Sequence, residues 1–323
     1  MSALLEVRDL YLEFKTSRGI LKALNGITFD VQHGEVFGLV GETGCGKTVT
    51  GLSILRLLPH SASITKGEVF FEGTNLLGLS HGEIEAVRGK KIAMIFQDPS
   101  TSLNPVFSVG SQIQRVVRQH LHLSNKQSVA KARDTLTAVG LPDVDRILGS
   151  YPHQLSGGMQ QRVMIAMALS CNPRLLIADE PTTALDVTIQ AQILKLLGEL
   201  QKKFDVSLIL ITHNLGIIAQ TCNRLAVLYG GRVAESGSTA DIFNHPQHPY
   251  TIGLMKAIPH LGGRGKKMAT IPGTVPNNPG AMPGCTFEPR CEFAMPRCSQ
   301  EVPPLYPIGE NHTSACFLAE HKA

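Results

Sequence analysis

The chain has 323 residues, of which 43% are apolar and 17% charged, so it can hold one large or two ordinary domains with ample core. A net charge of only +4, spread along the chain, gives no case for nucleic-acid binding. No apolar run approaches the roughly 18 residues that span a bilayer. Charged residues interrupt the N-terminal segment 1–14, which excludes a signal peptide. We therefore expect a cytosolic protein whose seven cysteines stay reduced.

Apolar patterns predict strands in the first third of the chain, at residues 4–14, 20–31, 35–40, 67–72 and 91–97. Helices are expected over 49–58, 108–121 and 127–139, and no strand pattern separates the last two. Further along, helices 157–169 and 187–203 alternate with buried strands at 174–178 and 206–212. This order predicts an α/β fold, with a parallel sheet flanked by helices, an antiparallel portion early in the chain and a helical insertion in the middle.

The C-terminal part of the chain differs from the rest in its composition, because it is rich in proline. Ten of the nineteen prolines fall in the last 65 residues, so regular elements should be scarce there. We expect one domain over residues 1–258, with a helical subdomain at about 101–160, and a separate, loop-rich extension over 259–323. The chain has no internal repeat, which excludes a tandem of two like domains.

A glycine-rich segment, Gly41-Glu42-Thr43-Gly44-Cys45-Gly46-Lys47-Thr48, fits the phosphate-loop pattern GxxxxGK[ST] in full. It lies between a predicted buried strand and a predicted helix, which is the context such a loop needs. Lys47 would reach the β- and γ-phosphates of a nucleoside triphosphate, and the Thr48 hydroxyl would bind magnesium. A chance glycine-rich turn is the alternative. The pattern and its flanks favour a nucleoside-triphosphate site.

Two carboxylates, Asp179 and Glu180, end the apolar run 175–178. In a phosphate-loop protein, an Asp at such a strand end holds magnesium, directly or through water. An adjacent Glu can accept a proton from the water that attacks the γ-phosphate. The alternative is a strand that ends in solvated acids, and the phosphate loop makes the first interpretation the stronger one.

The segment Leu155-Ser156-Gly157-Gly158-Met159-Gln160-Gln161 offers an N-cap serine and two glycines at a helix start. From the residues alone, an ordinary glycine-containing helix start is the alternative, and a single sequence does not exclude it. The segment is similar to the LSGGQ signature of the ABC-type ATPases, which the chain resembles over residues 4 to about 258. The other landmarks of that family follow in order: Gln97 resembles the Q-loop, Ala184-Leu185-Asp186 the D-loop, His213 the switch histidine, and Phe14, with Tyr11 as second candidate, the aromatic that stacks on adenine.

The resemblance implies a composite site in which the loop of one subunit and the Ser156–Gly158 turn of a second ABC ATPase subunit enclose ATP. Hydrolysis would then need a dimer, of identical or homologous subunits. The implied catalytic residues are Glu180 as general base, His213 at the γ-phosphate and Gln97 as the link to the coupling surface. The implied magnesium ligands are Thr48, Gln97 and Asp179. The implied nucleotide contacts are Phe14, Gly41, Glu42, Thr43, Gly44, Cys45, Gly46, Lys47, Thr48, Gln97, Asp179, Ser156, Gly157 and Gly158.

Two positions depart from the family pattern. Cys45 stands where the family commonly has Ser, and a thiol at a helix N-terminus beside Lys47 can have a lowered pKa and be oxidisable. The alternative, which we favour, is a small residue that merely fits. Asn214 follows the switch histidine where Asp is usual, which removes a charge near the dimer interface without abolishing turnover.

Four of the seven cysteines, Cys285, Cys291, Cys298 and Cys316, lie in the last 39 residues, separated by five, six and seventeen residues. The tight pairs of zinc ribbons are absent, and a cytosolic location argues against disulfides. An iron–sulfur cluster accepts this looser spacing, and unligated thiols are the alternative. Cys171 and Cys222 are expected to be buried small apolar residues.

Residues 284–291 and 297–298 resemble the C-terminal extension of oligopeptide and dipeptide importer ATPases, and the strings 100–105 and 245–251 support the same subfamily. The resemblance implies a 4Fe-4S cluster on the four cysteines, with zinc as the alternative metal. The cluster would hold the extension together, and a redox role is a second option.

The resemblance makes the chain the ATP-hydrolysing subunit of a membrane importer for dipeptides or oligopeptides. The implied partners are the second ATPase subunit, two transmembrane permease subunits and an extracytoplasmic solute-binding protein, but no nucleic acid. The chain would dock on the permeases through the helical insertion and the groove near Gln97, peripherally, at the cytoplasmic face of the cell membrane.

An importer of nickel or another small solute is the close alternative, because no ATPase subunit touches cargo. An ATPase that acts on nucleic acid or ribosomes is disfavoured: only 106 residues separate Thr48 from Leu155, without sustained heptads, and the chain has a single set of motifs. Glu180 and His213 argue against a regulatory protein that binds ATP without turnover.

Overall fold

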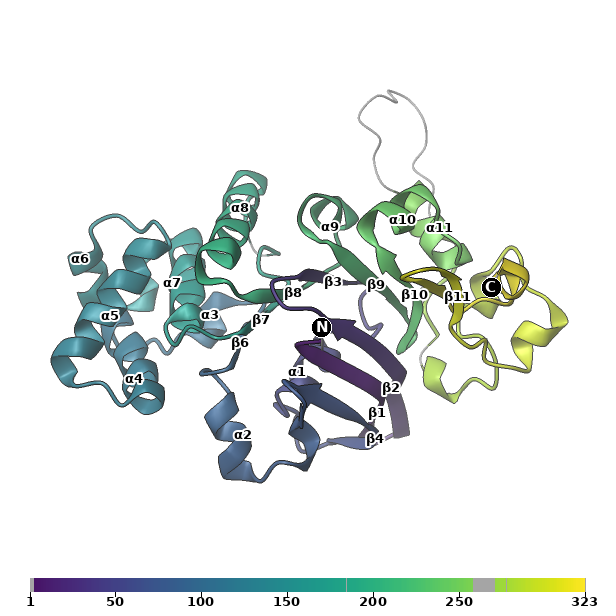
Figure 1. Cartoon of the computed structure of the whole chain (residues 1–323), viewed down its shortest axis with the longest axis horizontal. Helices are drawn as coiled ribbons and strands as arrows, with labels where there is room; N and C mark the ends of the chain where they lie inside the picture. The colour runs from purple at the N-terminus through teal and green to yellow at the C-terminus, as the bar shows by residue number, and fades with distance from the viewer. Residues whose placement is uncertain (1–2, 184, 258–270, 277, 323) are drawn as a thin grey trace. The chain divides into compact units, whose positions relative to one another are not determined.

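The computed structural model describes residues 3–183, 185–257, 271–276 and 278–322 (Figure 1). The chain divides into two compact units. The first comprises Met1–Gln32, Val36–Gly78 and Ile211–Ala323, and the second His33–Glu35 and Leu79–Leu210. Across the described ranges, none of the helices combines the length and the apolar character needed to cross a membrane.

The first unit contains two groups of strands. The antiparallel group is ordered β2-β1-β4-β5, and the second group is ordered β11-β12-β10-β9-β3, with β3 parallel to β9. The strands are β1 (Leu5–Thr16), β2 (Gly19–Val31), β3 (Val36–Val40), β4 (Ala62–Phe71), β5 (Thr74–Asn75), β9 (Arg224–Tyr229), β10 (Arg232–Ser238), β11 (Tyr306–Gly309) and β12 (His312–Ser314). The α-helices are α1 (Lys47–Ile54), α9 (Leu215–Thr221), α10 (Thr239–Asn244) and α11 (Pro249–Lys256). Short 3₁₀ turns are η1 (Leu76–Gly78), η3 (Pro279–Ala281), η4 (Glu288–Arg290), η5 (Pro296–Ser299) and η6 (Phe317–Lys322).

The predicted antiparallel portion is confirmed in β1, β2 and β4. β1 pairs with β2 from Leu5↔Val31 onward and with β4 from Leu5↔Phe71 onward. Along the first residues of β1, buried and partly exposed side chains alternate, as expected for a sheet with one face on the core. Asp9 has φ 48° and lies where the pairing shifts register, so it forms a β-bulge in β1.

The second unit contains strands β6 (Ile92–Ile95), β7 (Leu175–Asp179) and the start of β8 (Ser207–Thr212), whose last two residues count with the first unit. Its helices are α2 (His81–Val87), α3 (Pro99–Ser102), α4 (Val109–Leu121), α5 (Asn125–Ala138), α6 (Val144–Gly149), η2 (Pro152–Gln154), α7 (Gly157–Leu169) and α8 (Val187–Phe204). β6 and β7 are parallel, and every residue of β7 is buried. The run of helices α3 to α7 is the helical insertion that the sequence predicts.

Helix α4 shows why the insertion folds as helices. Val109, Ile113 and Val117 recur at every fourth position and are buried, which gives the helix one apolar face. Ser108 caps its first turn by accepting a hydrogen bond from the Ser111 backbone N–H. The proposed subdomain limits of about 101–160 remain a prediction.

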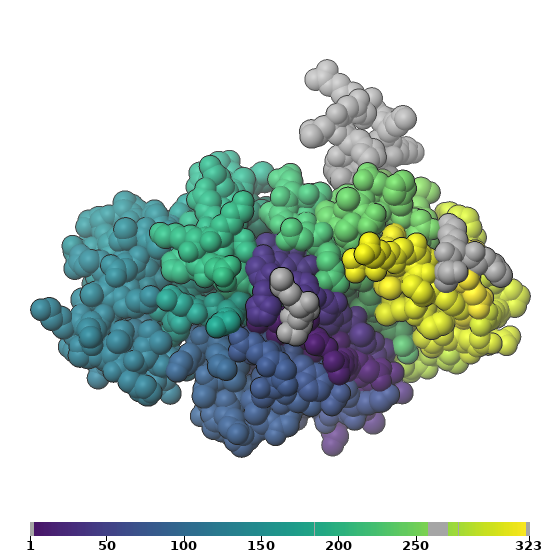
Figure 2. All heavy atoms as spheres, viewed as in Figure 1, coloured from purple at the N-terminus to yellow at the C-terminus, as the bar shows by residue number. Residues whose placement is uncertain are grey.

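The C-terminal extension is part of the first unit and continues its sheet. β11 and β12 form an antiparallel hairpin, and β12 pairs with β10 through Glu235↔Ser314 and Ser236↔Thr313. Figure 2 shows the C-terminal atoms, in yellow, lying directly against the green segment that contains β10. The extension thus shares a sheet with the residues before it, and its limits of 259–323 as a separate part remain a prediction. Ile258, where the sequence places the domain boundary, lies outside the described residues.

Candidate functional site

The glycine-rich segment forms a tight loop between β3 and α1. All five residues of β3 are buried, so the strand holds the start of the loop rigidly. Gly41, Gly44 and Gly46 have φ values of 149°, 82° and 105°, which side chains rarely allow. At Gly41, a Cβ atom would lie 2.2 Å from the carbonyl oxygen of Leu228. The glycines of the pattern are therefore required by the backbone path.

Lys47 anchors the loop from inside. Its Nζ donates hydrogen bonds to the carbonyl oxygens of Gly41, at 2.7 Å, and Glu42, at 3.1 Å, and the residue is only 5% exposed. Thr43, Gly44 and Thr48, by contrast, are exposed. Lys47 is the first residue of α1, and a lysine ammonium beside a glycine-rich loop at a helix start is an arrangement that binds polyphosphates.

Cys45 has the environment of a packing residue. It is fully buried, and burial raises the pKa of its thiol, although Lys47 Nζ at 3.8 Å acts in the opposite direction. The lowered pKa considered from the sequence is therefore wrong, because the cost of burying a thiolate exceeds the attraction of the lysine. The favoured alternative, a small residue that fits the site, is confirmed.

The two candidates for stacking on adenine differ in their surroundings. Phe14 lies near the end of β1, opposite Leu21 and Ala62, and is half-buried. Tyr11 is also half-buried, and the ammonium of Lys66 lies 5.3 Å from its ring centroid. Phe14 remains the predicted stacking residue, with Tyr11 as second candidate.

His213 directly follows β8 and is exposed. The next residue, Asn214, caps α9: its Oδ1 accepts hydrogen bonds from the backbone N–H groups of Gly216, at 2.9 Å, and Ile217, at 3.3 Å. Asn is one of the best N-cap residues. The departure from the usual Asp therefore removes a charge but keeps the cap.

In the second unit, β6 and β7 bring Gln97 and Glu180 together. The two strands are parallel and in register, with Ile95 opposite Ala178, so the residues after them emerge at the same edge of the sheet. Gln97 Nε2 donates to Glu180 Oε2 at 3.1 Å, and Thr183 Oγ1 donates to the same oxygen at 2.8 Å. Asp179, at the end of β7, is 3% exposed. The structure thus unites three residues that the sequence assigns to one site.

Ser156 caps α7, as the sequence predicts, by accepting a hydrogen bond from the Met159 backbone N–H at 3.4 Å. Ser156 and Gly157 are exposed and Gly158 is half-buried, so the turn offers an open helix N-terminus. Asp186 is the N-cap residue of α8, and Ala184 lies outside the described residues.

All four cysteines of the extension line one pocket. The same pocket is also lined by Phe287 and Phe317, so the thiols face a largely apolar surrounding. Burial raises the pKa of the Cys285 thiol to about 11, and it also raises the pKa values of Cys291 and Cys316. Within the described ranges, no three His, Cys, Asp or Glu side chains are arranged to hold a single metal ion. Cys171 and Cys222 are buried, as predicted.

Comparison with known proteins places these sites in a family. A model described as ABC transporter matches residues 24–183, and one described as oligopeptide/dipeptide transporter, C-terminal region, matches 234–298. A probable peptide ABC transporter ATP-binding protein of Sinorhizobium fredii is 50% identical, over 97% of this chain and 94% of its own. The chain belongs to the peptide ABC transporter ATP-binding family.

Two further members of this family align along almost their whole length. The dipeptide transport ATP-binding protein DppD of Bacillus subtilis is 48% identical, over 100% of this chain and 97% of its own. The oligopeptide transport ATP-binding protein OppD of Haemophilus influenzae is 45% identical, over 100% of this chain and 99% of its own. The family predicted from the motifs is therefore confirmed.

Solved structures support the fold of the ABC ATPase cassette. The ATP-binding cassette MJ0796, in a dimeric post-hydrolysis state with ADP and Pi, is 26% identical with a TM-score of 0.65, over 73% of this chain and 98% of its own. CbiO1 of Clostridium perfringens, part of the transporter complex cbiONQ, is 28% identical with a TM-score of 0.65, over 76% of this chain and 92% of its own. The predicted α/β fold class is confirmed.

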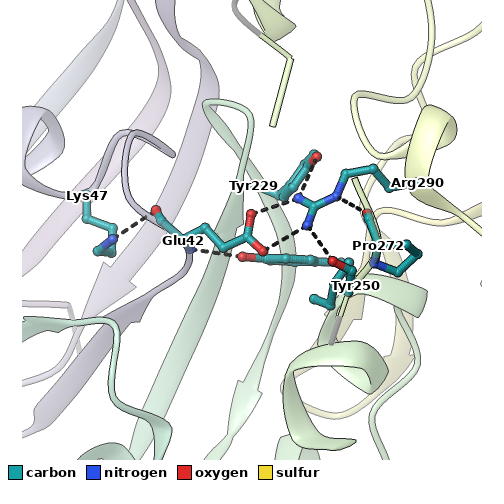
Figure 3. A network of polar contacts seen from close by, with 7 residues as sticks. Glu42, Lys47, Tyr229, Tyr250, Pro272 and Arg290 are labelled. Atoms are coloured by element: carbon teal, nitrogen blue, oxygen red, sulfur yellow. Dashed lines mark hydrogen bonds and ion pairs between the residues drawn. The ribbon is translucent and has the colours of Figure 1, made fainter. Parts of the chain in front are cut away.

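One contact of the phosphate loop in this chain could not be predicted from the sequence. Arg290, in the cysteine-bearing extension, pairs with Glu42 in the loop (Figure 3). The two residues are 248 positions apart, and neither belongs to a motif that specifies the other. Only the folded chain reveals this contact.

Proposed function

We propose that the chain hydrolyses ATP to power the import of dipeptides or oligopeptides through a membrane ABC transporter. The observation that carries this proposal is the 45–50% identity, over 97% or more of the chain, to proteins named for peptide, dipeptide and oligopeptide transport. The match of residues 234–298 to the C-terminal region of oligopeptide/dipeptide transporters supports the same cargo class.

In the proposed reaction, Lys47 and the loop N–H groups bind the phosphates, while Thr48, Gln97 and Asp179 hold the magnesium ion. Glu180 acts as general base toward the attacking water. Its carboxylate accepts hydrogen bonds from Gln97 and Thr183, which orient it. His213 contacts the γ-phosphate, and positioning and charge stabilisation supply most of the rate.

We also propose that a second ABC ATPase subunit completes each ATP site with its Ser156–Gly158 turn. The exposed turn in this chain and the dimeric form of the related cassette MJ0796 support this assignment. The remaining partners are two permease subunits and an extracytoplasmic solute-binding protein, which would place the chain at the cytoplasmic face of the membrane. Phe96, Val106 and Phe107, which are 39%, 71% and 44% exposed, suit docking on the permeases.

The experiment that tests the function is uptake of a radiolabelled dipeptide and of nickel by membrane vesicles that contain the complete transporter. ATP inside the vesicles should drive dipeptide uptake with the wild-type chain and not with Lys47→Ala, which loses the ammonium that binds the phosphates. The peptide assignment is overturned if nickel accumulates and the dipeptide does not. Equal dipeptide uptake with and without ATP would overturn the ATPase role.

For the extension, we propose a 4Fe-4S cluster held by Cys285, Cys291, Cys298 and Cys316. The gathering of all four thiols around one pocket supports it. Such a cluster takes one thiolate at each iron, so its ligands stand farther apart than those of a single metal ion. When bound, it would cross-link four loops that have little core of their own.

Anaerobic purification tests the cluster. The wild-type chain should carry about four irons and absorb visible light, as iron–sulfur clusters do. Cys291→Ser should lower the iron content, whereas Cys171→Ser, a buried cysteine of the second unit, should retain it. A colourless protein with one zinc per chain, or with no metal, would overturn the cluster.

A further inference from the structure

Arg290 links the cysteine-bearing extension to the phosphate loop, within the first unit. Its Nη1 donates to Glu42 Oε2 at 2.7 Å and its Nη2 to Glu42 Oε1 at 3.1 Å (Figure 3). This two-point contact uses the planar fork of the guanidinium, which a lysine cannot reproduce. The side chain of Arg290 is 5% exposed and that of Glu42 is 29% exposed. The pair is therefore an ion pair largely withdrawn from solvent.

The guanidinium is held on its other sides as well. Nε donates to the carbonyl oxygen of Pro272 at 2.9 Å, Nη1 to the Tyr229 hydroxyl at 3.3 Å and Nη2 to the carbonyl oxygen of Ile271 at 3.4 Å. Because these groups belong to the extension and to β9, the position of Arg290 is set independently of the loop. Glu42 thus pairs with a guanidinium that Pro272, Tyr229 and Ile271 also hold in place.

Glu42 is also held through its backbone. Its N–H donates to the Tyr250 hydroxyl at 2.9 Å, and its carbonyl oxygen accepts a hydrogen bond from Lys47 Nζ at 3.1 Å (Figure 3). The same carbonyl oxygen accepts a hydrogen bond from the Cys45 N–H at 3.2 Å. Glu42, the partner of Arg290, therefore also supplies one of the two backbone carbonyl oxygens that hold the ammonium of Lys47. Glu42 therefore contacts Arg290 through its side chain and Lys47 through its backbone.

The turn that carries Arg290 is packed on the same aromatic rings. Phe287, at the start of η4, lies edge-on to Tyr229 at 5.1 Å between ring centroids and packs on Tyr250 at 5.4 Å. Both tyrosine hydroxyls contact the Arg290–Glu42 pair. Cys285 and Cys291 stand at either end of this segment, so whatever occupies the cysteine pocket holds both ends of the turn.

We propose that Arg290 is a positioning residue for the phosphate loop, through which the C-terminal extension sets the affinity of the chain for ATP. Arg290 touches no phosphate in this assignment; it acts through Glu42 on the placement of Lys47. The inference rests on the proposed function only in that the loop binds ATP, and it does not depend on the cargo.

A double-mutant cycle tests the coupling. Arg290→Gln, Glu42→Gln and the double variant are prepared as full-length chains, and the dissociation constant of a fluorescent ATP analogue is measured. Each single variant should bind about tenfold more weakly, and the double variant no more weakly than the poorer single one, because all three remove the same contact. Arg290→Lys, which keeps the charge but not the fork, should fall between wild type and Arg290→Gln.

Arg297→Gln is the matched control, because Arg297 also lies in the extension and also forms ion pairs, with Glu301 and Glu320, but its side chain is far more exposed than that of Arg290. It should bind the analogue like wild type. In the assembled transporter, KM for ATP should rise with Arg290→Gln while kcat changes less. Multiplicative effects in the double variant, or wild-type affinity in folded Arg290→Gln and Glu42→Gln, would overturn the inference.

The outcome is separable from that of the function itself. If the transporter moves no peptide but the wild-type chain binds the analogue, the cargo proposal fails and the cycle still decides the role of Arg290. Glu42→Gln keeps Arg290 attached to Pro272, Ile271 and Tyr229, so it tests the coupling even where Arg290→Gln unfolds.

Discussion

Glu180 adopts a backbone conformation that is uncommon for a residue with a side chain. Its φ is 44°, in the left-handed region, at the point where β7 has just ended. The hydrogen bonds from Gln97 and Thr183 to one carboxylate oxygen hold the side chain in this turn. Backbone strain of about 1–3 kcal/mol is typical of positions where orientation matters for function. The geometry is thus consistent with a carboxylate that must be aimed at a water.

Glu180→Gln should separate ATP binding from hydrolysis. The amide keeps the size of the side chain and can still accept from Thr183, but it cannot take a proton from the attacking water. We expect ATP to bind as in wild type and turnover in the assembled transporter to fall by about 10²- to 10⁴-fold. Analogue binding and phosphate release measure the two quantities.

Thr183→Val provides the comparison, because it removes one hydrogen bond to the carboxylate and leaves the base in place. Its turnover should lie much nearer to wild type. Turnover by Glu180→Gln within a fewfold of wild type would remove Glu180 from the role of base, whatever its geometry.

Among the helices and strands, those with local signals are predictable from the sequence. Helix α7 spans the predicted residues 157–169, because a serine cap and two glycines mark its start. The buried strands β3 and β7 follow from their continuous apolar runs. Helix α2 is absent from the prediction, although Ser80 and Glu83 form a capping box that marks its start. The predicted helix 49–58 ends early, because Arg56 has φ 53°.

The elements of the extension depend on contacts that the sequence does not encode locally. β12 has three residues and pairs both with its neighbour β11 and with β10, which lies 74 residues or more earlier in the chain. The same limit applies to the site. The phosphate loop, Glu180 and Ser156 lie in motifs and are predictable, whereas the pairing of Arg290 with Glu42 arises only from folding. Local sequence patterns therefore predict the motifs, whereas contacts such as Arg290–Glu42, which hold a motif in place, form only when distant parts of the chain pack together.

The contact between the extension and the rest of the first unit centres on one buried carboxylate. Glu235, in β10, is fully buried; its Oε1 accepts from His312 Nε2 at 2.7 Å and from the Gln247 N–H at 2.8 Å. Its Oε2 accepts from the His248 N–H at 2.8 Å. One residue thereby joins β10, β12 and the N-cap of α11 in a buried network of hydrogen bonds.

His248 makes this stability sensitive to acid. Burial lowers the pKa of His248 to about 4, although Glu235 acts in the opposite direction, so the folded protein keeps the ring neutral. Its Nδ1 accepts the Tyr250 N–H at 3.0 Å and caps α11, a contact that protonation of Nδ1 would break. Between about pH 4 and the unfolded value near 6.5, the unfolded chain binds a proton that the folded chain does not. Stability therefore rises with pH across this window and is lost as pH falls through it.

We expect His248 to account for a loss of about 2 kcal/mol in the free energy of unfolding between about pH 7 and about pH 5. Urea unfolding of wild type and His248→Asn at the two pH values measures this contribution. Asn keeps an acceptor for the Tyr250 N–H but does not titrate, so the variant should lose less stability on acidification by that amount. Other titrating groups contribute equally to both proteins and cancel. Parallel pH dependences of the two proteins would mean that His248 binds its proton as readily when folded as when unfolded.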